Sequence, residues 1–274
     1  MSNNMTITTG DVFIPEIWSK ETIEEVRSKL VLANLVWRFD KECKSGDTIH
    51  VPSLTNFVAN DKIKNLPVQF QAPTETNLDI TINKHKESSF QIEDMLATQA
   101  ARDLRAPYTD AAGYAIGKAI DTDIATLGAA LAQTKGTYNT AITTDVILDS
   151  IELLDLGDVP EEDRHFAFRP DVKRDLLDLS NYVSADYVDG RPVTTGKVGA
   201  LYGVATHMTT NLIKAAGTNT NNILFHKQAF AAAVQKNMRV QSEYSVKDLA
   251  NLVVADCIYG VKTTRPAFGV LIKT

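Results

Sequence analysis

The segment from residue 44 to residue 90 constrains the fold most, because it predicts two strands that leave the body of the protein. A turn signal at residues 45–47 precedes a β-type run at residues 48–51, and apolar and polar residues alternate over residues 78–83. Residues 57–76, between the two runs, are mostly polar and have no helical period. The pattern predicts a long hairpin with an irregular end. Because an isolated hairpin is only marginally stable in water, this one indicates contact with another subunit.

The composition is that of a folded, water-soluble protein. The chain has 274 residues, 44% of them hydrophobic, and a net charge of −6. These values exclude a disordered or fibrous protein and suit one large domain or two small ones. Cys43 and Cys257 have no paired spacing, which predicts reduced thiols in a cytosol-like compartment and excludes a secreted disulfide scaffold.

Three classes of location or ligand are also disfavoured. Residues 1–10 are polar and lack the basic and apolar regions of an export signal. The apolar stretch at residues 249–258 is interrupted by Asn251 and Asp256 and is shorter than the roughly 20 residues of a membrane span. A charge of −6 without a dense block of Lys and Arg argues against nucleic acid as the main ligand.

The first half of the chain predicts two helical regions. An amphipathic helix follows a candidate N-cap at Ser19, with Ile23, Val26, Leu30 and Val31 at helical spacing. Residues 91–133 are rich in alanine, and their apolar residues recur every three or four positions. We expect Pro107 to divide this region into a short helix to about Arg105 and a long spine helix over residues 109–133.

From residue 144 onward, short helices and strands alternate without βαβ regularity, which predicts an α+β fold. Four helices are expected, at residues 145–156, from Pro170 to Leu179, at residues 226–236 and at residues 246–259. Five strands are expected, at residues 166–168, 203–208, 223–225, 238–244 and 267–272. Loops occupy residues 183–199.

No motif predicts catalysis, a cofactor or a metal site. The five histidines are scattered and have no ligand spacing; they are His50, His85, His165, His207 and His226. Asp121-Thr122-Asp123 is interpreted as a solvated helix face, and Glu161-Glu162-Asp163 as a solvated turn. The glycine-rich residues 195–203 lack the GK[ST] ending of a phosphate-binding loop, and Cys257 is interpreted as a core residue.

The order of the elements resembles that of the tailed-bacteriophage major capsid proteins, whose Hong Kong phage capsid fold also forms encapsulin shells. Three phrases carry the resemblance, namely Arg164-His165-Phe166-Ala167-Phe168-Arg169-Pro170 before a helix, residues 223–231 (ILFHKQAFA) and residues 245–273. The resemblance implies an N-terminal arm and helix at residues 1–43 and an extended β-hairpin loop at residues 44–93. It also implies a peripheral domain with the spine helix at residues 94–139 and 226–274, and an axial domain at residues 140–225.

The resemblance implies a capsid protein, not an enzyme, that self-assembles into hexamers and pentamers of an icosahedral shell enclosing phage double-stranded DNA. Its expected partners are other copies of itself, a separate scaffolding protein, a portal and decoration proteins, with no sequence-specific nucleic acid and no membrane. Its expected location is the virion capsid, after assembly in the host bacterial cytoplasm. Some relatives cross-link through lysine, for which Lys62 and Lys64 are conceivable donors, but no acidic catalyst or acceptor Asn can be matched.

Two alternatives remain open from the sequence. The first is an encapsulin-like cellular compartment of the same fold, and the second is a cytosolic enzyme whose site has no recognisable motif.

Overall fold

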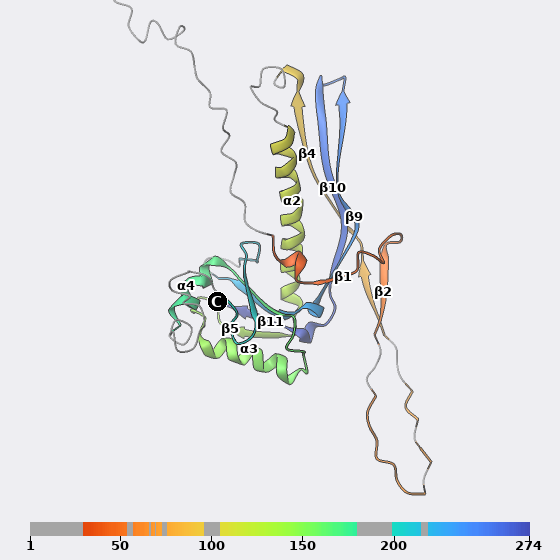
Figure 1. Cartoon of the computed structure of the whole chain (residues 1–274), viewed down its shortest axis with the longest axis vertical. Coiled ribbons are helices and arrows are strands. Elements are labelled where there is room, and N and C mark those ends of the chain that lie inside the picture. The colour runs from red at the N-terminus through yellow and green to blue at the C-terminus, as the bar shows by residue number, and fades with distance from the viewer. Residues whose placement is uncertain are drawn as a thin grey trace, which may run out of the picture.

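The computed structural model describes residues 30–53, 57–65, 67–68, 70–72, 76–95, 105–179, 199–214 and 219–274. Their strands form a four-stranded sheet, a five-stranded sheet and a two-stranded hairpin, and helices lie against both larger sheets (Figure 1). The predicted α+β class is therefore confirmed. The helix predicted after Ser19 lies mostly outside the described residues, and Leu30 and Val31 at its expected end are not helical.

The four-stranded sheet runs along one side of the long helix. Its order is β1 (Trp37–Arg38), β9 (Phe230–Ser245), β10 (Ala250–Thr263) and β4 (Lys84–Glu93). The strand β10 pairs antiparallel with both β9 and β4 and therefore forms the centre of the sheet.

Two expected helices, at residues 226–236 and 246–259, are wrong. The first is a 3-10 turn, η4 (Lys227–Ala229), followed by β9, and the second lies mostly within β10. Their alanine-rich and valine-rich runs match a buried helix and a buried strand equally well, and periodicity alone cannot separate the two. Long-range pairing with β4 decides for the strand, since tertiary context overrides local propensity.

The spine helix α2 (Arg105–Thr126) lies beside β4 and β10 and continues into the 3-10 helix η3 (Leu127–Ala130) (Figure 1). The expected break at Pro107 does not occur, because Pro107 lies in the first turn of α2, where the missing N–H costs nothing. The short helix expected to end at about Arg105 lies mostly outside the described residues. The helix ends before residue 133, where β5 (Gln133–Gly136) begins.

The five-stranded sheet is covered on both faces. Its order is β5, β11 (Gly269–Lys273), β8 (Asn221–His226), β6 (Arg164–Phe168) and β7 (Ala205–Met208). Successive side chains of β6 point to opposite faces of the sheet and therefore pack in different cores. Phe166 and Phe168 pack with the helices α3 (Thr144–Leu156) and α4 (Pro170–Asp178), whereas Ala167 packs with the end of α2.

Both of these helices start where the sequence predicted. Thr143 is the N-cap of α3 and accepts a hydrogen bond from the backbone nitrogen of Val146, and Pro170 occupies the first position of α4. The expected strands at residues 166–168, 203–208, 223–225, 238–244 and 267–272 correspond to β6, β7, β8, the outer part of β9 and β11. The expected loops at residues 183–199 fall almost entirely outside the described residues.

The hairpin is confirmed, but it is shorter than the expected residues 44–93. Its strands β2 (Thr48–Ser53) and β3 (Thr76–Thr81) pair antiparallel, with Thr48 opposite Thr81 and Ser53 opposite Thr76. In contrast, β4 pairs with β10 along its whole length, so residues 84–93 belong to the four-stranded sheet and not to the hairpin.

The five-stranded sheet joins strands from distant parts of the chain. The strand β5 and the closing strand β11 pair with each other, and β11 pairs with β8. Residues 133–136 and 269–273 therefore lie in the same sheet as β6 and β7, which fall within the expected axial domain at residues 140–225.

Candidate assembly surfaces

The base of the hairpin is held firmly against the body of the protein. Ile80 is fully buried and packs with Phe39, Cys43 and the alanines at the start of β9. The backbone nitrogen of Ile82 donates to the carbonyl oxygen of Asp47 at 2.7 Å, which closes the hairpin at this end. The paired strands β2 and β3 therefore fix the direction in which residues 57–72 project.

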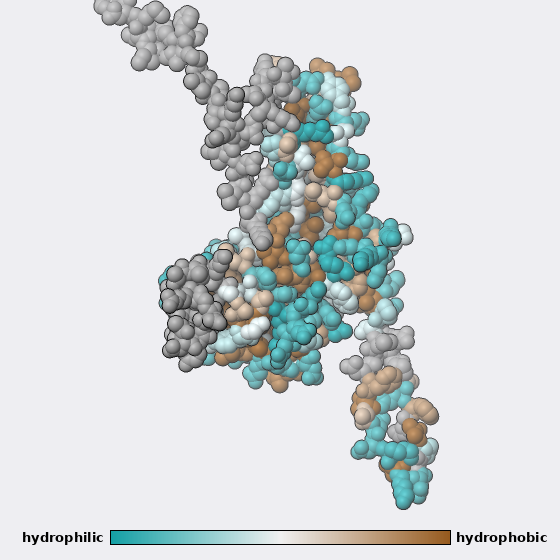
Figure 2. Space-filling model, viewed as in Figure 1, coloured by the Kyte–Doolittle hydropathy of each residue, from teal (hydrophilic) through white to brown (hydrophobic). Residues whose placement is uncertain are grey.

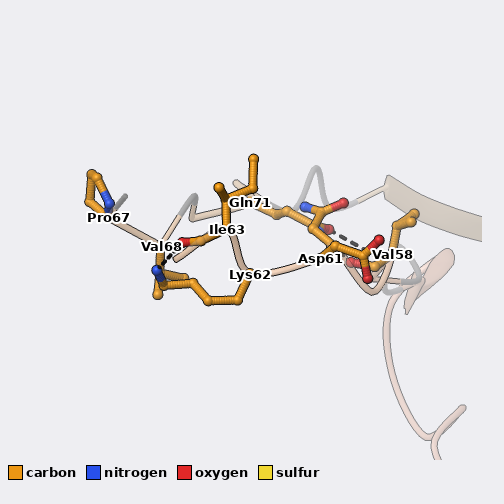
Figure 3. Close-up of a pocket in the computed structure, with 8 residues that line it drawn as sticks. Val58, Asp61, Lys62, Ile63, Pro67, Val68 and Gln71 are labelled. Carbon is orange, nitrogen blue, oxygen red and sulfur yellow. Dashed lines mark hydrogen bonds between the residues drawn. The ribbon is translucent and has the colours of Figure 1, made fainter. Parts of the chain in front are cut away.

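In the outer part of the hairpin, residues 57–72, the described residues 57–65, 67–68 and 70–72 form no strand and are joined through side chains. The Gln71 side chain bonds both backbone groups of Val58, because its amide oxygen accepts from the backbone nitrogen at 3.1 Å and its amide nitrogen donates to the carbonyl oxygen. Lys62 donates to the carbonyl oxygen of Ile63 at 2.7 Å. A hollow of about 440 Å³ lies between the two arms, lined by Val58, Asn60, Asp61, Lys62, Ile63, Pro67, Val68 and Gln71 (Figure 3).

Large apolar side chains are exposed on this outer part. Phe70 is 94% exposed and Phe57 is 70% exposed, and Val58, Ile63 and Val68 are also exposed. In Figure 2, apolar and polar residues are interleaved along the projection, which extends well away from the body of the molecule. Clustered exposed apolar side chains on a projection are typical of an interaction surface.

A second exposed apolar group lies at the opposite end of the molecule, around the turn that joins β9 to β10. Val246 is 77% exposed and Leu249 is 61% exposed, and Tyr244 on β9 and Met95 just after β4 are also exposed. Tyr244 donates a hydrogen bond to Asp94 at 2.6 Å, which joins β9 to the end of β4. The molecule therefore presents apolar surface at both of its ends.

The four-stranded sheet lies between these two ends, and a buried carboxylate connects three of its strands. The Asp256 carboxylate on β10 accepts from Arg239 on β9 at 2.6 and 3.0 Å and lies 3.0 Å from the imidazole of His85 on β4. The hydrogen bonds from Arg239 and His85 lower the pKa of Asp256 to about 2. These three side chains connect three neighbouring strands.

The interpretation of Asp121-Thr122-Asp123 as a solvated helix face is wrong. Asp121 is 0% exposed and accepts hydrogen bonds from the backbone nitrogens of Val31 and Ala33. Asp123 accepts from the Tyr259 hydroxyl at 2.6 Å and lies 3.0 Å from the Lys84 ammonium. Burial alone would raise the pKa of Asp123, but the bonds from Tyr259 and Lys84 outweigh it and lower that pKa.

Two histidines that are scattered in the sequence meet in the five-stranded sheet, and a third lies on the neighbouring strand. His165 on β6 and His207 on β7 are 3.3 Å apart between ring nitrogens, and His226 on the neighbouring strand β8 is mostly buried. Burial lowers the pKa of all three imidazoles. The other two lie apart from this group, since His50 contacts Asp79 in the hairpin and His85 contacts Asp256. Only strand pairing could reveal this proximity, because no sequence spacing signals it.

The remaining candidate residues behave as packing or turn residues. Cys257 is buried, as predicted, but on a strand and not on a helix, and its thiol donates to the carbonyl oxygen of Lys236. Burial raises the pKa of the Cys257 thiol, which keeps it protonated. The acidic residues 161–163 are exposed in a turn, as predicted. Of the glycine-rich residues 195–203, only 199–203 are described, and they lead into β7.

Within the described ranges, no group of three or more His, Cys, Asp or Glu side chains is arranged to hold a metal ion. Among the described helices, none is long and apolar enough to cross a membrane.

The fold combines a projecting hairpin, a long helix beside a four-stranded sheet, and a separate five-stranded sheet. The family model described as phage capsid protein matches residues 39–273. The chain belongs to the phage capsid protein family. A comparison with curated proteins finds no match.

Solved capsid structures share the fold over nearly the whole chain. A structure from Mycobacterium phage Che8 is 24% identical, with a TM-score of 0.81, and the match covers 99% of this chain and 98% of that chain. The capsid of the cyanophage P-SCSP1u is 18% identical, with a TM-score of 0.83 and coverages of 99% and 96%. The capsid of a native GTA particle is 13% identical, with a TM-score of 0.76 and coverages of 99% and 99%.

The expected Hong Kong phage capsid fold is therefore confirmed, and so is the expected family. The chain is a major capsid protein, a structural subunit that assembles with copies of itself into the shell of a virion.

Proposed function

We propose that this capsid protein forms hexamers and pentamers of an icosahedral shell around double-stranded DNA, and that its hairpin loop lies over a neighbouring subunit. The observation that carries the proposal is the set of exposed apolar side chains on residues 57–72, above all Phe57 and Phe70. The described residues of this part belong to none of the buried hydrophobic clusters, so their apolar side chains are covered only when another surface meets them.

The energetics support assembly through many weak contacts. Fully burying one large apolar side chain is worth about 1.5–3 kcal/mol, and part of that gain is offset by ordering the loop. One loop therefore binds its neighbour weakly. In a closed symmetric assembly the same contact is repeated at every subunit, and the contacts reinforce one another.

We further propose a domain division that follows the sheets. The peripheral domain comprises residues 84–126 and 230–263, which hold α2 and most of the four-stranded sheet. The axial domain comprises residues 127–229 and 264–274, which hold the five-stranded sheet with α3 and α4. Sheet membership supports this division, because every strand of one sheet then falls in one domain except the short β1.

The charge of the chain supports a container and not a tight DNA-binding protein. Affinity for DNA comes mainly from Lys and Arg that neutralise phosphates, and this chain carries 28 basic against 34 acidic side chains. The proposal includes a purely structural role without catalysis, assembly in the host bacterial cytoplasm, and a separate scaffolding protein, a portal and decoration proteins as partners.

An encapsulin-like compartment of the same fold is the second candidate, and the match to the phage capsid family favours the virion. The two differ in contents. Purified particles that hold DNA would support the virion shell, whereas particles that hold a captured cargo protein and no DNA would support the compartment.

Negative-stain electron microscopy of the purified protein, with and without a crowding agent, tests the assembly. We expect closed shells, tubes or six-fold rings from the wild type. A variant in which a short Gly-Ser turn replaces residues 57–72 should keep the wild-type circular dichroism spectrum but form few such particles. Normal shells from this variant would contradict the role of the loop, and a wild type that stays monomeric in every condition would contradict assembly without a partner.

A further inference from the structure

Two half-buried histidines meet at the edge of the five-stranded sheet. β7 is the edge strand and pairs in parallel with β6, with His165 opposite Ala205 and His207 opposite Ala167. Both histidines therefore lie on the same face of the sheet, two residues apart along the strands. Their rings meet edge to face with centroids 5.2 Å apart, and the Nδ1 atom of His165 lies 3.3 Å from the Nε2 atom of His207.

This separation between nitrogens matches that of two imidazoles bound to one tetrahedral metal ion. Each nitrogen lies about 2.0–2.1 Å from Zn²⁺ in protein sites, so two such ligands at the tetrahedral angle are about 3.3 Å apart. The two nitrogens are therefore already at the spacing that one ion requires, and the rings must rotate so that both lone pairs point at the ion.

The protonation state of the pair is also suitable. Burial lowers the pKa of both imidazoles, and the proximity of His207 lowers that of His165 further, which favours the neutral form of both rings. A neutral imidazole has one nitrogen lone pair available to a metal. In the metal-free pair, one ring donates its N–H to the other. Chelation requires that ring to carry its proton on the other nitrogen, a tautomer change that releases no proton.

We propose that His165 and His207 form a binding site for a divalent transition-metal ion of the zinc type, completed by water. Imidazole nitrogens prefer Zn²⁺, Ni²⁺ and Cu²⁺ over Mg²⁺ and Ca²⁺. The nearby Asp163 favours positive charge at His165, while Lys227 opposes it. His226 is not a third ligand through its Nδ1 atom, because that nitrogen accepts a hydrogen bond from the backbone nitrogen of Gln228 at 3.2 Å.

Calorimetric titration of the full chain with ZnCl₂ at neutral pH, after treatment with a chelator, tests the site. We expect one saturable Zn²⁺ site per chain. The variants His165→Gln and His207→Gln should each lose at least about tenfold in affinity, since even the loss of a group that only supports a ligand costs 10–100-fold. The matched controls His50→Gln and His85→Gln should bind like the wild type, because each removes a histidine that contacts a single carboxylate elsewhere.

Thermal unfolding separates binding from folding defects. Zn²⁺ should raise the melting temperature of the wild type and of both controls, and EDTA should reverse the rise, because a ligand that binds only the folded state stabilises it. The melting temperature of His207→Gln should not respond to Zn²⁺. Since His207 is on the edge strand, this variant tests the proposal even if His165→Gln fails to fold. Absence of saturable binding by the wild type, or unchanged binding by His207→Gln, would overturn the proposal.

Discussion

The Asp121 carboxylate on α2 lies 2.8 Å from the backbone nitrogen of Val31, which is 90 positions away in the sequence. It also accepts hydrogen bonds from the backbone nitrogens of Leu32 and Ala33 and from the side-chain amide of Asn211. A carboxylate at this place satisfies the first N–H groups of the 3-10 helix η2 (Leu32–Asn34), which have no partner within the helix. One buried side chain therefore joins the spine helix to two other segments of the chain.

Replacing Asp121 with Ala should destabilise the folded subunit by about 3 kcal/mol. The substitution leaves buried N–H groups without an acceptor, and each such group costs about 1–3 kcal/mol, although the costs do not add fully. Urea denaturation followed by circular dichroism measures the free energy of unfolding. Asp110→Ala on an exposed position of the same helix is the matched control and should change it by less than about 0.5 kcal/mol. Equal stabilities for the two variants would contradict the role of Asp121.

Replacing Gly260 with Ala should destabilise the junction between the hairpin and the sheet. A Cβ atom at this position of β10 would overlap the carbonyl oxygen of Thr81 and lie 2.9 Å from its carbonyl carbon, so backbone must move. Overpacking of this kind costs about 1–3 kcal/mol. The control Gly199→Ala introduces a Cβ that meets no atom within 4 Å. If both variants unfold at the same urea concentration, the close approach of Thr81 to Gly260 does not exist in solution.

Replacing Phe70 with Asp should impair assembly without unfolding the subunit. Phe70 is 94% exposed, so the monomer loses almost no buried area, whereas a subunit that covers this side chain would bury an unpaired charge. Sedimentation velocity should show fewer and smaller assemblies than the wild type, with an unchanged melting temperature of the monomer. Asn60→Asp adds the same charge at a polar, exposed position of the loop and is the control for charge alone. Wild-type assembly by Phe70→Asp would place this side chain outside any subunit contact.

The stability of the folded subunit should depend on Asp256 at acidic pH. Its pKa is held at about 2 in the folded state, below the ordinary value of 3.8, so the unfolded chain takes up a proton first as the pH falls. The stabilisation by Asp256 is thus fully present above the ordinary value and is lost as the pH falls from about 4 to about 2. Urea denaturation should show that Asp256→Asn is less stable than the wild type at pH 7 and that the difference shrinks over this window. Glu243→Gln, exposed on β9, is the control, and a difference that does not change with pH would contradict the prediction.

Local sequence patterns predicted the elements whose signals are short-range. The turn at residues 45–47 and the alternation at residues 78–83 located the hairpin, and Pro170 located the start of α4. The resemblance in the order of elements predicted the family and the Hong Kong phage capsid fold, which the family match and the solved capsids confirm.

Errors arose where the environment of a segment decides between two locally acceptable structures. Residues 246–259 have the composition of a buried helix, and only the pairing of β10 with two neighbouring strands shows that they are extended. The prediction that Asp121 is solvated was wrong for the same reason. A carboxylate on a helix is normally solvated unless donors from distant segments surround it, as they do here.

The sequence alone therefore determined the hairpin, the long helix, the negative charge and the class of fold, since these follow from local periodicity, turn residues and composition. The tertiary structure decided which strands pair, which acidic residues are buried and which histidines meet. His165 and His207 are 42 positions apart and touch only because β6 and β7 are neighbours in one sheet. Such contacts depend on the packing of the whole chain, and no local pattern of residues encodes them.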